Sequence, residues 1–329
     1  MSALAPTLQG FFTERMLTQR RASPNTVASY RDTFRLLLAF AQRRTGKTPS
    51  TLQLEDLDAV LIGAFLDHLE AERNNSARTR NTRLAAVHSL FAYAALRHPE
   101  HAALIQRVLT IPAKRTDRQL VSFLTHDEVD ALLAAPDRGT WLGRRDHALL
   151  LVAVQTGLRV SELTSLTCQD VELGTGAHVR CHGKGRKERI TPLTAQACGV
   201  LRVWLAERRG EPCDPLFPNR RRERLSRDAV ALLVAKHARA ATQHRPSLGS
   251  KTVTPHVLRH TCAMALLAVG VDITVIALWL GHEGVESTQI YLHADLAIKE
   301  RALARTAPAG TKPGRYRAPD SLIAFLEAL

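Results

Sequence analysis

Apolar residues recur at helical spacing along the N-terminal third of the chain, with polar residues between them. This spacing predicts helices over residues 7–21, over 24–44, from about Leu57 to Leu69, and from about Ser76 to Leu96. After His98 the pattern fades into the basic, polar stretch 114–118, which is typical of an exposed linker. We therefore expect an all-helical N-terminal domain over residues 1–112, followed by a linker over 113–120.

Helical periodicity returns after the linker, but one short region has the period of two that strands show. Residues 178–182 and 188–192 are extended runs on either side of Gly183-Lys-Gly-Arg-Lys187, and they predict a β-hairpin with a basic loop. The helices expected in this second domain cover residues 125–135, 143–156, 194–209, 226–241, 255–269, 272–280 and 286–291. The fold class is mostly α with a small antiparallel β-sheet, and the second domain spans residues 121–306.

The last stretch of the chain, residues 307–329, is expected to form a tail with a short helix. Ala307–Arg317 is polar, and Pro319-Asp320-Ser321 offers helix-start chemistry. An apolar stripe follows it and would not remain in water on so short a helix. The stripe consists of Leu322, Ile323, Phe325, Leu326 and Leu329. Docking on the same domain and docking on a neighbouring protomer are both compatible with this pattern.

An excess of basic residues narrows the choice of partner. The chain has 45 Lys+Arg against 31 Asp+Glu, a net charge of +14 that favours a polyanion such as nucleic acid or an anionic membrane surface. Both halves are basic, as a clamp around a DNA duplex requires, and two separately solvated basic surfaces without a shared ligand are the less favoured alternative. No apolar run approaches the length that crosses a bilayer, and the N-terminus lacks the pattern of a secretory signal, so we expect a cytoplasmic protein.

The cysteine pattern and several familiar motifs argue against metal or nucleotide chemistry. Five widely spaced cysteines include no CxxC pair, so zinc sites and redox couples are not favoured. The GxxxxGK[ST], GxGxxG and HExxH patterns are missing as well. We therefore expect neither a cofactor nor a metal.

Three groups of cationic and imidazole residues carry candidate chemistry. His256 and Arg259 lie three positions apart at a helix start opened by Thr254-Pro255, where free N–H groups favour a phosphate. Arg159 and Glu162 follow the helix predicted over residues 143–156, which ends before Gly157, and the arginine can form hydrogen bonds to two phosphate oxygens. Lys184 lies in the predicted hairpin loop. Each group alone also fits a purely structural interpretation, as a capped helix, a surface ion pair or a solvated turn.

Together with Gly281-His282 and Tyr291, these residues follow one another in an order that resembles the tyrosine recombinase (phage integrase) family, most closely its Xer-like and mobile-element members. The segments that carry the resemblance are SPNTVASYRDTFRLLLAFA, TGLRVSEL, HGKGRKERITPL, TPHVLRHTCA, LGH and STQIYLH, which span most of residues 1–300. The resemblance implies a helical core-binding domain followed by a catalytic domain. It also implies a site-specific recombinase that cleaves and rejoins DNA through a 3′-phosphotyrosyl intermediate, in integration, transposition or resolution of a mobile element.

The resemblance implies a role for each matching residue. Tyr291 is the implied nucleophile. Arg159 and Arg259 are implied to bind the phosphate. The remaining members are the paired histidines His256 and His282, the hairpin lysine Lys184, and the supporting acid Glu162. Arg186 and Lys187 are rival basic residues in the same loop. The implied partners are double-stranded recombination sites and further copies of the chain, as a dimer on each site and a tetramer in the synapse. Accessory recombinases of the same element are candidate partners, and no membrane is involved.

This set of residues agrees with the chemistry that the reaction needs. A phenol with a pKa near 10 attacks poorly at neutral pH unless positive charge or a base assists it. Two arginines and two imidazoles supply charge that metal ions supply in many nucleases, and Lys184 is the candidate general acid for the leaving 5′ oxygen. A type IB topoisomerase-like enzyme and a catalytically silent DNA-binding accessory protein are the alternatives.

Overall fold

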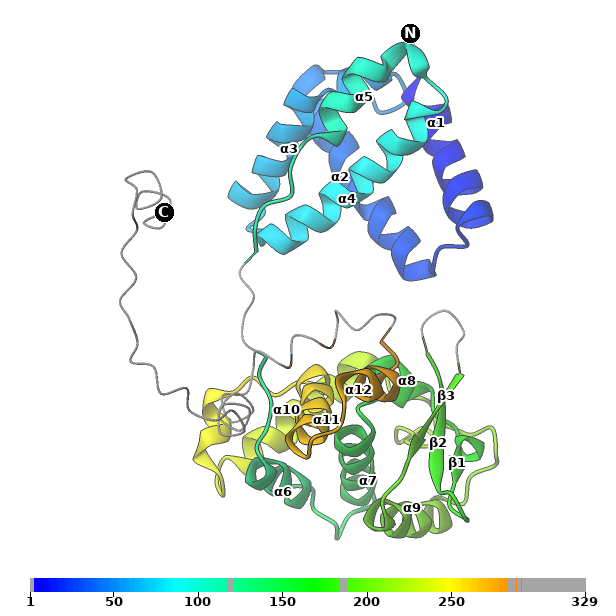
Figure 1. Ribbon diagram of the computed structural model, residues 1–329, viewed down its shortest axis with the longest axis vertical. Helices are drawn as coiled ribbons and strands as arrows, with labels where there is room; N and C mark the ends of the chain where they lie inside the picture. Colours follow the sequence, from blue (N-terminus) through cyan, green and yellow to red (C-terminus); the bar gives the residue numbers. More distant parts are fainter. Residues whose placement is uncertain (1–2, 117–120, 184–187, 283–287, 289–290, 292–329) are drawn as a thin grey trace, which may run out of the picture. The chain divides into compact units, whose positions relative to one another are not determined.

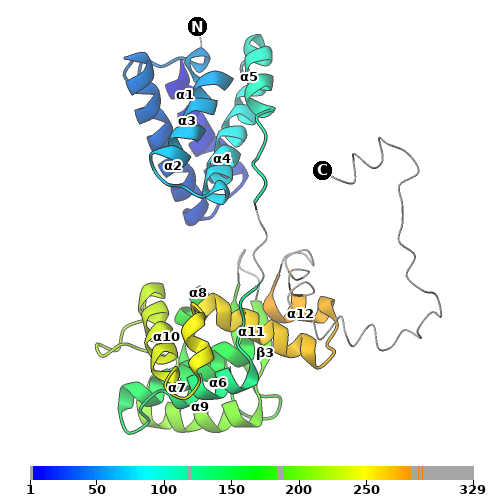
Figure 2. The same ribbon diagram turned by 90° about the vertical axis from the view of Figure 1, so that its left-hand side faces the viewer.

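The computed structural model divides into two compact units, Met1–Arg118 and Gln119–Leu329 (Figures 1 and 2). It describes residues 3–116, 121–183, 188–282, 288 and 291. Each unit has its own hydrophobic core. The mostly helical fold class with a small antiparallel sheet is confirmed, and the boundaries predicted for the domains and the linker remain predictions.

The N-terminal unit is a bundle of helices whose starts follow the local sequence. Ser23, Asp58 and Ser76 each accept a hydrogen bond from a backbone N–H in the first turn of the helix that follows, which satisfies a donor that the helix leaves free. The elements are α1 (Leu4–Gly10), the π-helical η1 (Phe11–Gln19), α2 (Pro24–Thr45), the 3₁₀ turn η2 (Leu54–Leu57), α3 (Ala59–Ala71), α4 (Ala77–Ala95), the 3₁₀ turn η3 (Pro99–His101) and α5 (Ala102–Leu109).

Helix α5 corrects the interpretation of the stretch after His98, where the fading pattern predicted no helix. This short helix packs against α3 and α4 and buries Ile105 and Val108. The chain stays attached to the unit beyond α5, because Asn81 pairs with both backbone groups of Lys114 at 2.7 and 3.0 Å. Six of the eight residues of α5 are apolar, but a helix of about two turns is too short for periodicity alone to distinguish it from a loop.

The C-terminal unit is built around α7 (Trp141–Thr156), whose residues 145–153 are all buried. It packs against α6 (His126–Ala134), α9 (Ala195–Arg208) and α11 (Pro255–Ala268). The remaining helical elements are α8 (Val160–Ser165), the 3₁₀ turn η4 (Cys168–Asp170), α10 (Arg227–Ala241), the 3₁₀ turn η6 (Pro246–Ser250) and α12 (Ile273–Leu280). Burial on every side explains why the sequence of α7 is apolar with little amphipathic contrast.

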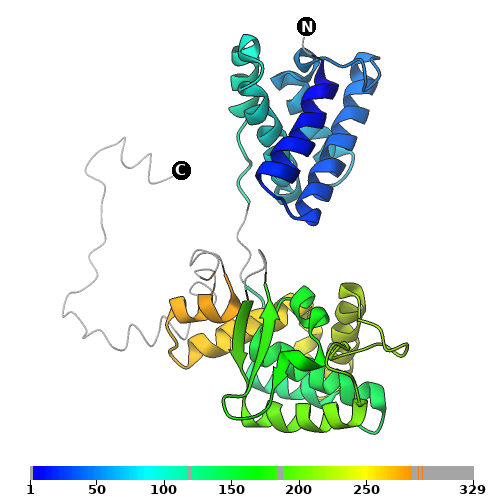
Figure 3. The same ribbon diagram turned by 90° about the vertical axis from the view of Figure 1, so that its right-hand side faces the viewer.

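The predicted hairpin is present and belongs to a three-stranded antiparallel sheet of order β1-β2-β3. Strands β2 (His178–His182) and β3 (Glu188–Pro192) pair from His178 opposite Pro192 to His182 opposite Glu188, and the short β1 (Val171–Glu172) pairs with the start of β2. The hairpin end of β2 and β3 lies on the same side of this unit as α8 and α12, whereas α9 lies on the opposite side (Figures 1 and 3). This end therefore faces the region that carries the candidate site.

Several predictions fall outside the described residues. Lys184 with its rivals Arg186 and Lys187, the tail over 307–329, and most of the predicted helix 286–291 are among them. In the described part of the chain, no helix combines the length and apolar character needed to cross a membrane.

Candidate active site

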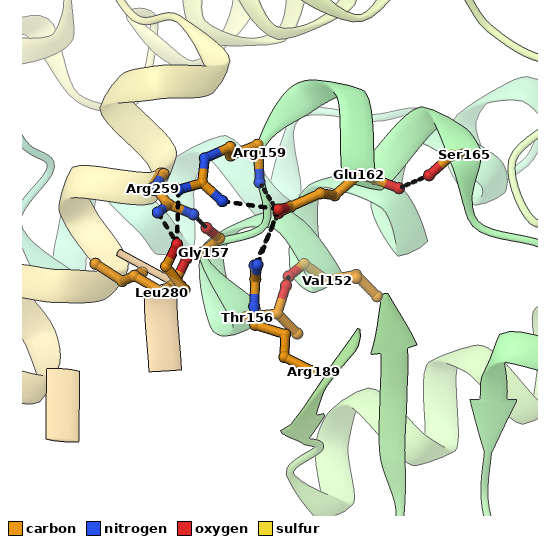
Figure 4. Close-up of polar contacts among 10 residues, drawn as sticks. Val152, Thr156, Gly157, Arg159, Glu162, Ser165, Arg189, Arg259 and Leu280 are labelled. Atoms are coloured by element: carbon orange, nitrogen blue, oxygen red, sulfur yellow. Dashed lines mark hydrogen bonds and ion pairs between the residues drawn. The ribbon is translucent and has the colours of Figure 1, made fainter. Parts of the chain in front are cut away.

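Two arginines from separate elements converge at the ends of helices α7 and α12 (Figure 4). Arg259, on α11, donates from Nη1 to the carbonyl of Gly157 and from Nη2 to the carbonyl of Leu280, both at 2.7 Å. Arg159, the N-cap of α8, donates from Nη2 to the carbonyl of Gly281 at 2.8 Å. These carbonyls lie at helix C-termini, where the helix dipole favours a cation, so both guanidinium groups are fixed before any ligand arrives.

A glycine is required where α7 meets α11 and α12. Gly157 has φ +62°, and a Cβ added there would lie 2.6 Å from Cδ2 of Leu280 and 3.1 Å from Sγ of Cys262. Only glycine adopts this backbone conformation without strain and leaves room for those side chains. The TGLR segment thus brings the end of α7 close enough for Arg259 to reach its carbonyl.

The carboxylate of Glu162 is buried between two arginines. It accepts from Nη1 of Arg159 at 2.9 Å and from both Nη1 and Nη2 of Arg189 at 2.8 Å. Burial opposes the charge on Glu162, but the hydrogen bonds from Arg189 and Arg159 outweigh it and hold the pKa of the carboxyl below its ordinary value. The acid expected to support its neighbours therefore orients Arg159 directly and ties strand β3 to α8.

Arg189 is missing from the set of residues predicted from the sequence. It lies on β3, where exposed and covered positions alternate, so Arg189 and the buried Thr191 share the inward side of the strand. A fork-to-fork pair between guanidinium and carboxylate is geometrically specific and strong. An arginine at an inward strand position was the signal available in the sequence, because a buried guanidinium needs a carboxylate partner.

Tyr291 is buried, with 1% of its surface exposed, in an apolar cluster between α11 and α12. The cluster includes Ala263, Met264, Ile276 and Leu280. Burial raises the pKa of the Tyr291 hydroxyl to about 12, against the opposing effect of the Arg259 charge. The phenol is therefore protonated at neutral pH in this state.

Two histidines contact the tyrosine, and a third packs against one of them. The ring of His282 stacks on that of Tyr291 with centroids 6.5 Å apart, and its Nδ1 lies 2.7 Å from Oγ1 of the buried Thr288. Burial, with the Arg259 and Arg159 charges, lowers the pKa of His282 to about 4. His256 is on the exposed first turn of α11, and its ring centroid lies 4.2 Å from that of His260. His260 and Thr288, like Arg189, are site residues that the sequence analysis missed.

Of the residues predicted from the sequence, the structure brings Arg159, Glu162, Arg259, His282 and Tyr291 together. His256 packs against His260, and Nδ1 of His260 lies 3.0 Å from the Tyr291 oxygen. Lys184 lies outside the described residues. Among the residues that the structure does describe, no group of three or more metal-ligating side chains is arranged to hold a metal ion.

A basic two-unit chain with two fixed arginines, three histidines and one tyrosine at a common site fits the class of enzymes that cut and rejoin DNA strands through a tyrosine. The chain belongs to the tyrosine recombinase (phage integrase) family and is a tyrosine-type site-specific DNA recombinase. A profile described as "Phage integrase family" matches residues 122–297, and one described as "Phage integrase, N-terminal SAM-like domain" matches residues 10–98.

Relatives along the whole chain agree with this assignment. A protein of Sinorhizobium fredii named putative integrase/recombinase y4rC is 59% identical over 328 residues, which cover 100% of this chain and 99% of the relative. Tyrosine recombinase XerD of Pseudomonas putida is 34% identical over 317 residues, covering 94% and 100% of the two chains.

Solved structures show the same fold at lower identity. XerH site-specific recombinase bound to a palindromic difH substrate has a TM-score of 0.69 at 22% identity, covering 87% of this chain and 81% of that chain. The Tn1549 transposon integrase in complex with circular intermediate DNA has a TM-score of 0.68 at 16% identity, covering 93% and 100%.

Proposed function

We propose that this recombinase binds recombination sites in double-stranded DNA and exchanges strands through a covalent bond between Tyr291 and a 3′ phosphate, in integration, transposition or resolution of a mobile element. The observation that carries the proposal is the junction of α7, α11 and α12. There Arg159 and Arg259 are fixed on helix-end carbonyls, and both act electrostatically on the buried Tyr291. Positive charge fixed beside a nucleophile is what a charged phosphoryl transition state requires.

The proposed step conserves a phosphodiester bond. The Tyr291 hydroxyl releases its proton to solvent water while its oxygen attacks phosphorus. The bond from phosphorus to the 5′ oxygen breaks, and a 3′-phosphotyrosyl ester replaces it. Arg159, Arg259 and the histidines His256 and His282 stabilise the negative charge that develops on the phosphoryl oxygens. Lys184 gives a proton to the departing 5′ oxygen. A 5′ hydroxyl from a second DNA reverses the attack, so neither ATP nor water is consumed.

The Arg189–Glu162–Arg159 cluster supports this assignment. Arg159 is held by a carboxylate on one side and by the Gly281 carbonyl on the other, so its direction is set independently of the substrate. Prior fixation of this kind lowers the reorganisation needed when a phosphate binds. The bacterial relatives named integrase/recombinase and tyrosine recombinase XerD support a role at DNA recombination sites, which we place in the cytoplasm. Strand exchange between two sites implies a dimer on each site and a tetramer in the synapse.

The test is covalent trapping on a nicked duplex. A site is first selected from DNA fragments flanking the gene by binding to the purified protein, and is then prepared with a nick that lets the cleaved end diffuse away. The wild-type chain is expected to form a protein–DNA adduct, while Tyr291→Phe binds the same site without forming one. Binding without any adduct from the wild-type chain would favour the accessory DNA-binding protein instead.

Two further arms address the remaining alternatives. The charge-stabilising roles are assigned to side chains, so adduct formation is expected to persist in EDTA. Loss of the adduct in EDTA, restored by magnesium, would contradict that assignment. Relaxation of supercoiled plasmid lacking the selected site, by a chain that acts as a monomer, would favour the topoisomerase-like alternative.

A further inference from the structure

The hydroxyl of Tyr291 has a defined partner outside the residues assigned to the reaction. Nδ1 of His260 lies 3.0 Å from the tyrosine oxygen, and the ring centroids are 5.4 Å apart in an edge-on arrangement. His260 directly follows Arg259 on α11. One turn of this helix therefore carries both the arginine fixed by the two carbonyls and the histidine that contacts the tyrosine hydroxyl. None of the roles proposed above uses this histidine.

The protonation states fix the direction of this hydrogen bond. Burial, together with the nearby His256, Arg259 and His282, lowers the pKa of His260 to about 4, so its imidazole is neutral at neutral pH. Tyr291 remains protonated in the same range. The phenol therefore donates and Nδ1 accepts, which assigns the imidazole proton to Nε2.

The ring and the hydroxyl of Tyr291 are held by different contacts. The ring itself is held by the apolar cluster and by stacking with His282, at an interplanar angle of 14°. Apolar packing fixes the ring but leaves the hydroxyl hydrogen free to rotate. His260 supplies the directional contact, and the ring of His256 packs edge-on against the ring of His260, with 71° between the two ring planes.

We propose that His260 is a positioning residue for the nucleophile: its neutral Nδ1 accepts the hydrogen bond of Tyr291 and keeps the attacking oxygen in register with the phosphate site defined by Arg159 and Arg259. This inference rests on the proposed function, in which Tyr291 is the nucleophile. A residue that acts only by accepting this bond is replaceable by another acceptor at the same place. Asparagine provides one, because its Oδ1 occupies nearly the position of a histidine Nδ1.

The experiment compares single-turnover adduct formation on the nicked duplex for the wild-type chain, His260→Asn and His260→Phe. His260→Phe fills the same space without an acceptor, and we expect its rate to fall about 10²-fold, the scale for misplacing a reacting group by about 1 Å. His260→Asn is expected within about fivefold of wild type. Binding of the duplex should be unchanged in both. The matched control is His126→Phe, at an exposed position on α6.

Rescue by asparagine separates positioning from a merely structural role and from proton transfer. If His260→Phe cleaves at the wild-type rate, or if His260→Asn is as slow as His260→Phe, the positioning role is overturned. Should His260→Phe fail to fold by tryptophan fluorescence, His260→Ala takes its place with the same expected loss. A wild-type chain that forms no Tyr291-dependent adduct refutes the proposed function itself, which distinguishes that failure from failure of the inference.

Discussion

The two units bury different kinds of side chain. The core of the N-terminal unit is aliphatic and aromatic, with Phe11 in ring contact with Phe12, Tyr30, Phe34 and Tyr93. Among the described residues, its only buried charged side chain is that of Arg80. The C-terminal unit instead encloses charged residues within its core. They are Glu128, Arg145, Asp146, Glu162 and Arg259.

The difference in buried side chains reflects whether a unit must hold charged groups in defined positions. Apolar packing is sufficient to hold a helical bundle, because hydrophobic burial needs no particular direction. A site that binds a phosphate must hold charges in place, and burying a charge is unfavourable unless hydrogen bonds and a counter-charge offset the loss of water. Glu162 meets that condition through the guanidinium of Arg189, and the charge of Arg259 is stabilised by two carbonyls at helix C-termini. Buried charge networks should therefore add to apolar packing in stabilising the C-terminal unit, whereas the N-terminal unit should depend mainly on apolar contacts.

The largest expected effect comes from Arg189→Met, which leaves Glu162 buried with one of its two arginine partners. Removing one member of a buried ion pair costs about 3–5 kcal/mol of stability. All three tryptophans of the chain, Trp141, Trp204 and Trp279, belong to the C-terminal unit, so urea unfolding followed by tryptophan fluorescence reports on this unit. Arg180→Met, at an exposed position of β2, is the control. An equal effect from both variants would contradict the role of the buried cluster.

Arg259→Ala is expected to reduce adduct formation at least ~10²-fold, equivalent to about 2.7 kcal/mol, the scale for losing one prearranged charge-stabilising group. The measurement is the single-turnover rate on the nicked duplex at saturating protein. Arg202→Ala changes an exposed arginine on α9, which lies on the opposite side of the unit from α8 and α12 (Figures 1 and 3). A normal rate for Arg259→Ala would refute its assigned role in binding phosphate.

Much of the fold follows from the sequence because both cores obey local rules. The helix starts predicted at residue 24 and near Ser76 lie close to the observed starts at Pro24 and Ala77, and the two extended runs predicted the hairpin. Short elements were missed: α5 and α8, of eight and six residues, are too short for periodicity alone to identify them, and β1 has two residues. These elements are stabilised by their tertiary neighbours rather than by their own sequence.

The candidate site was predictable only as far as its motifs reach. Arg159 and Arg259 were predicted from their positions beside predicted helix ends, His282 and Tyr291 came from the resemblance, and the structure brings the four together. Arg189 and His260 were not predicted, because nothing local shows that an arginine on β3 meets a carboxylate on α8, or that a histidine on α11 meets Tyr291. These pairings join residues far apart in sequence, and only the packing of the helices and the sheet creates them.

A smaller loss of stability is expected when the charge of Asp146 is removed. Its carboxylate accepts from Nε2 of His237 at 2.8 Å and from Nε of Arg145 at 2.9 Å. Burial opposes ionisation, but these bonds and the Arg145 charge hold the pKa of Asp146 below its ordinary value. Hydrogen bonds to charged groups contribute roughly 1.5–3 kcal/mol, so Asp146→Asn should cost about 2 kcal/mol at pH 7.

The pH dependence of this loss has a definite sign. A depressed carboxyl pKa contributes stability that is present above the unfolded value of about 3.9 and is lost as the pH falls through the lower folded value. The difference between wild type and Asp146→Asn, measured by urea unfolding with tryptophan fluorescence, should therefore shrink from pH 7 to pH 3. A difference that stays constant over this range would show that the ionised form of Asp146 is not what stabilises the fold.

The smallest expected effect tests whether apolar and aromatic contacts stabilise the N-terminal unit. Phe11→Leu keeps an apolar side chain of similar size but removes a ring that stacks on Tyr30 at 6.3 Å and meets Phe34 and Tyr93 edge-on. Aromatic pairs contribute about 0.5–1.5 kcal/mol beyond area burial, so the N-terminal unit should lose about 1 kcal/mol. Hydrogen exchange of α2 and α4 measures this loss, because buried helical amides there open with the unit. Tryptophan-monitored unfolding of the C-terminal unit should not change.

Val60→Ala is the control for this last measurement, since Val60 is 80% exposed on α3 and its truncation should alter stability by less than about 0.5 kcal/mol. If Phe11→Leu instead destabilises the C-terminal unit as much as its own, the two cores unfold together. The N-terminal unit would then not be an independently stabilised apolar core. Faster exchange confined to the N-terminal unit supports two independently stabilised cores.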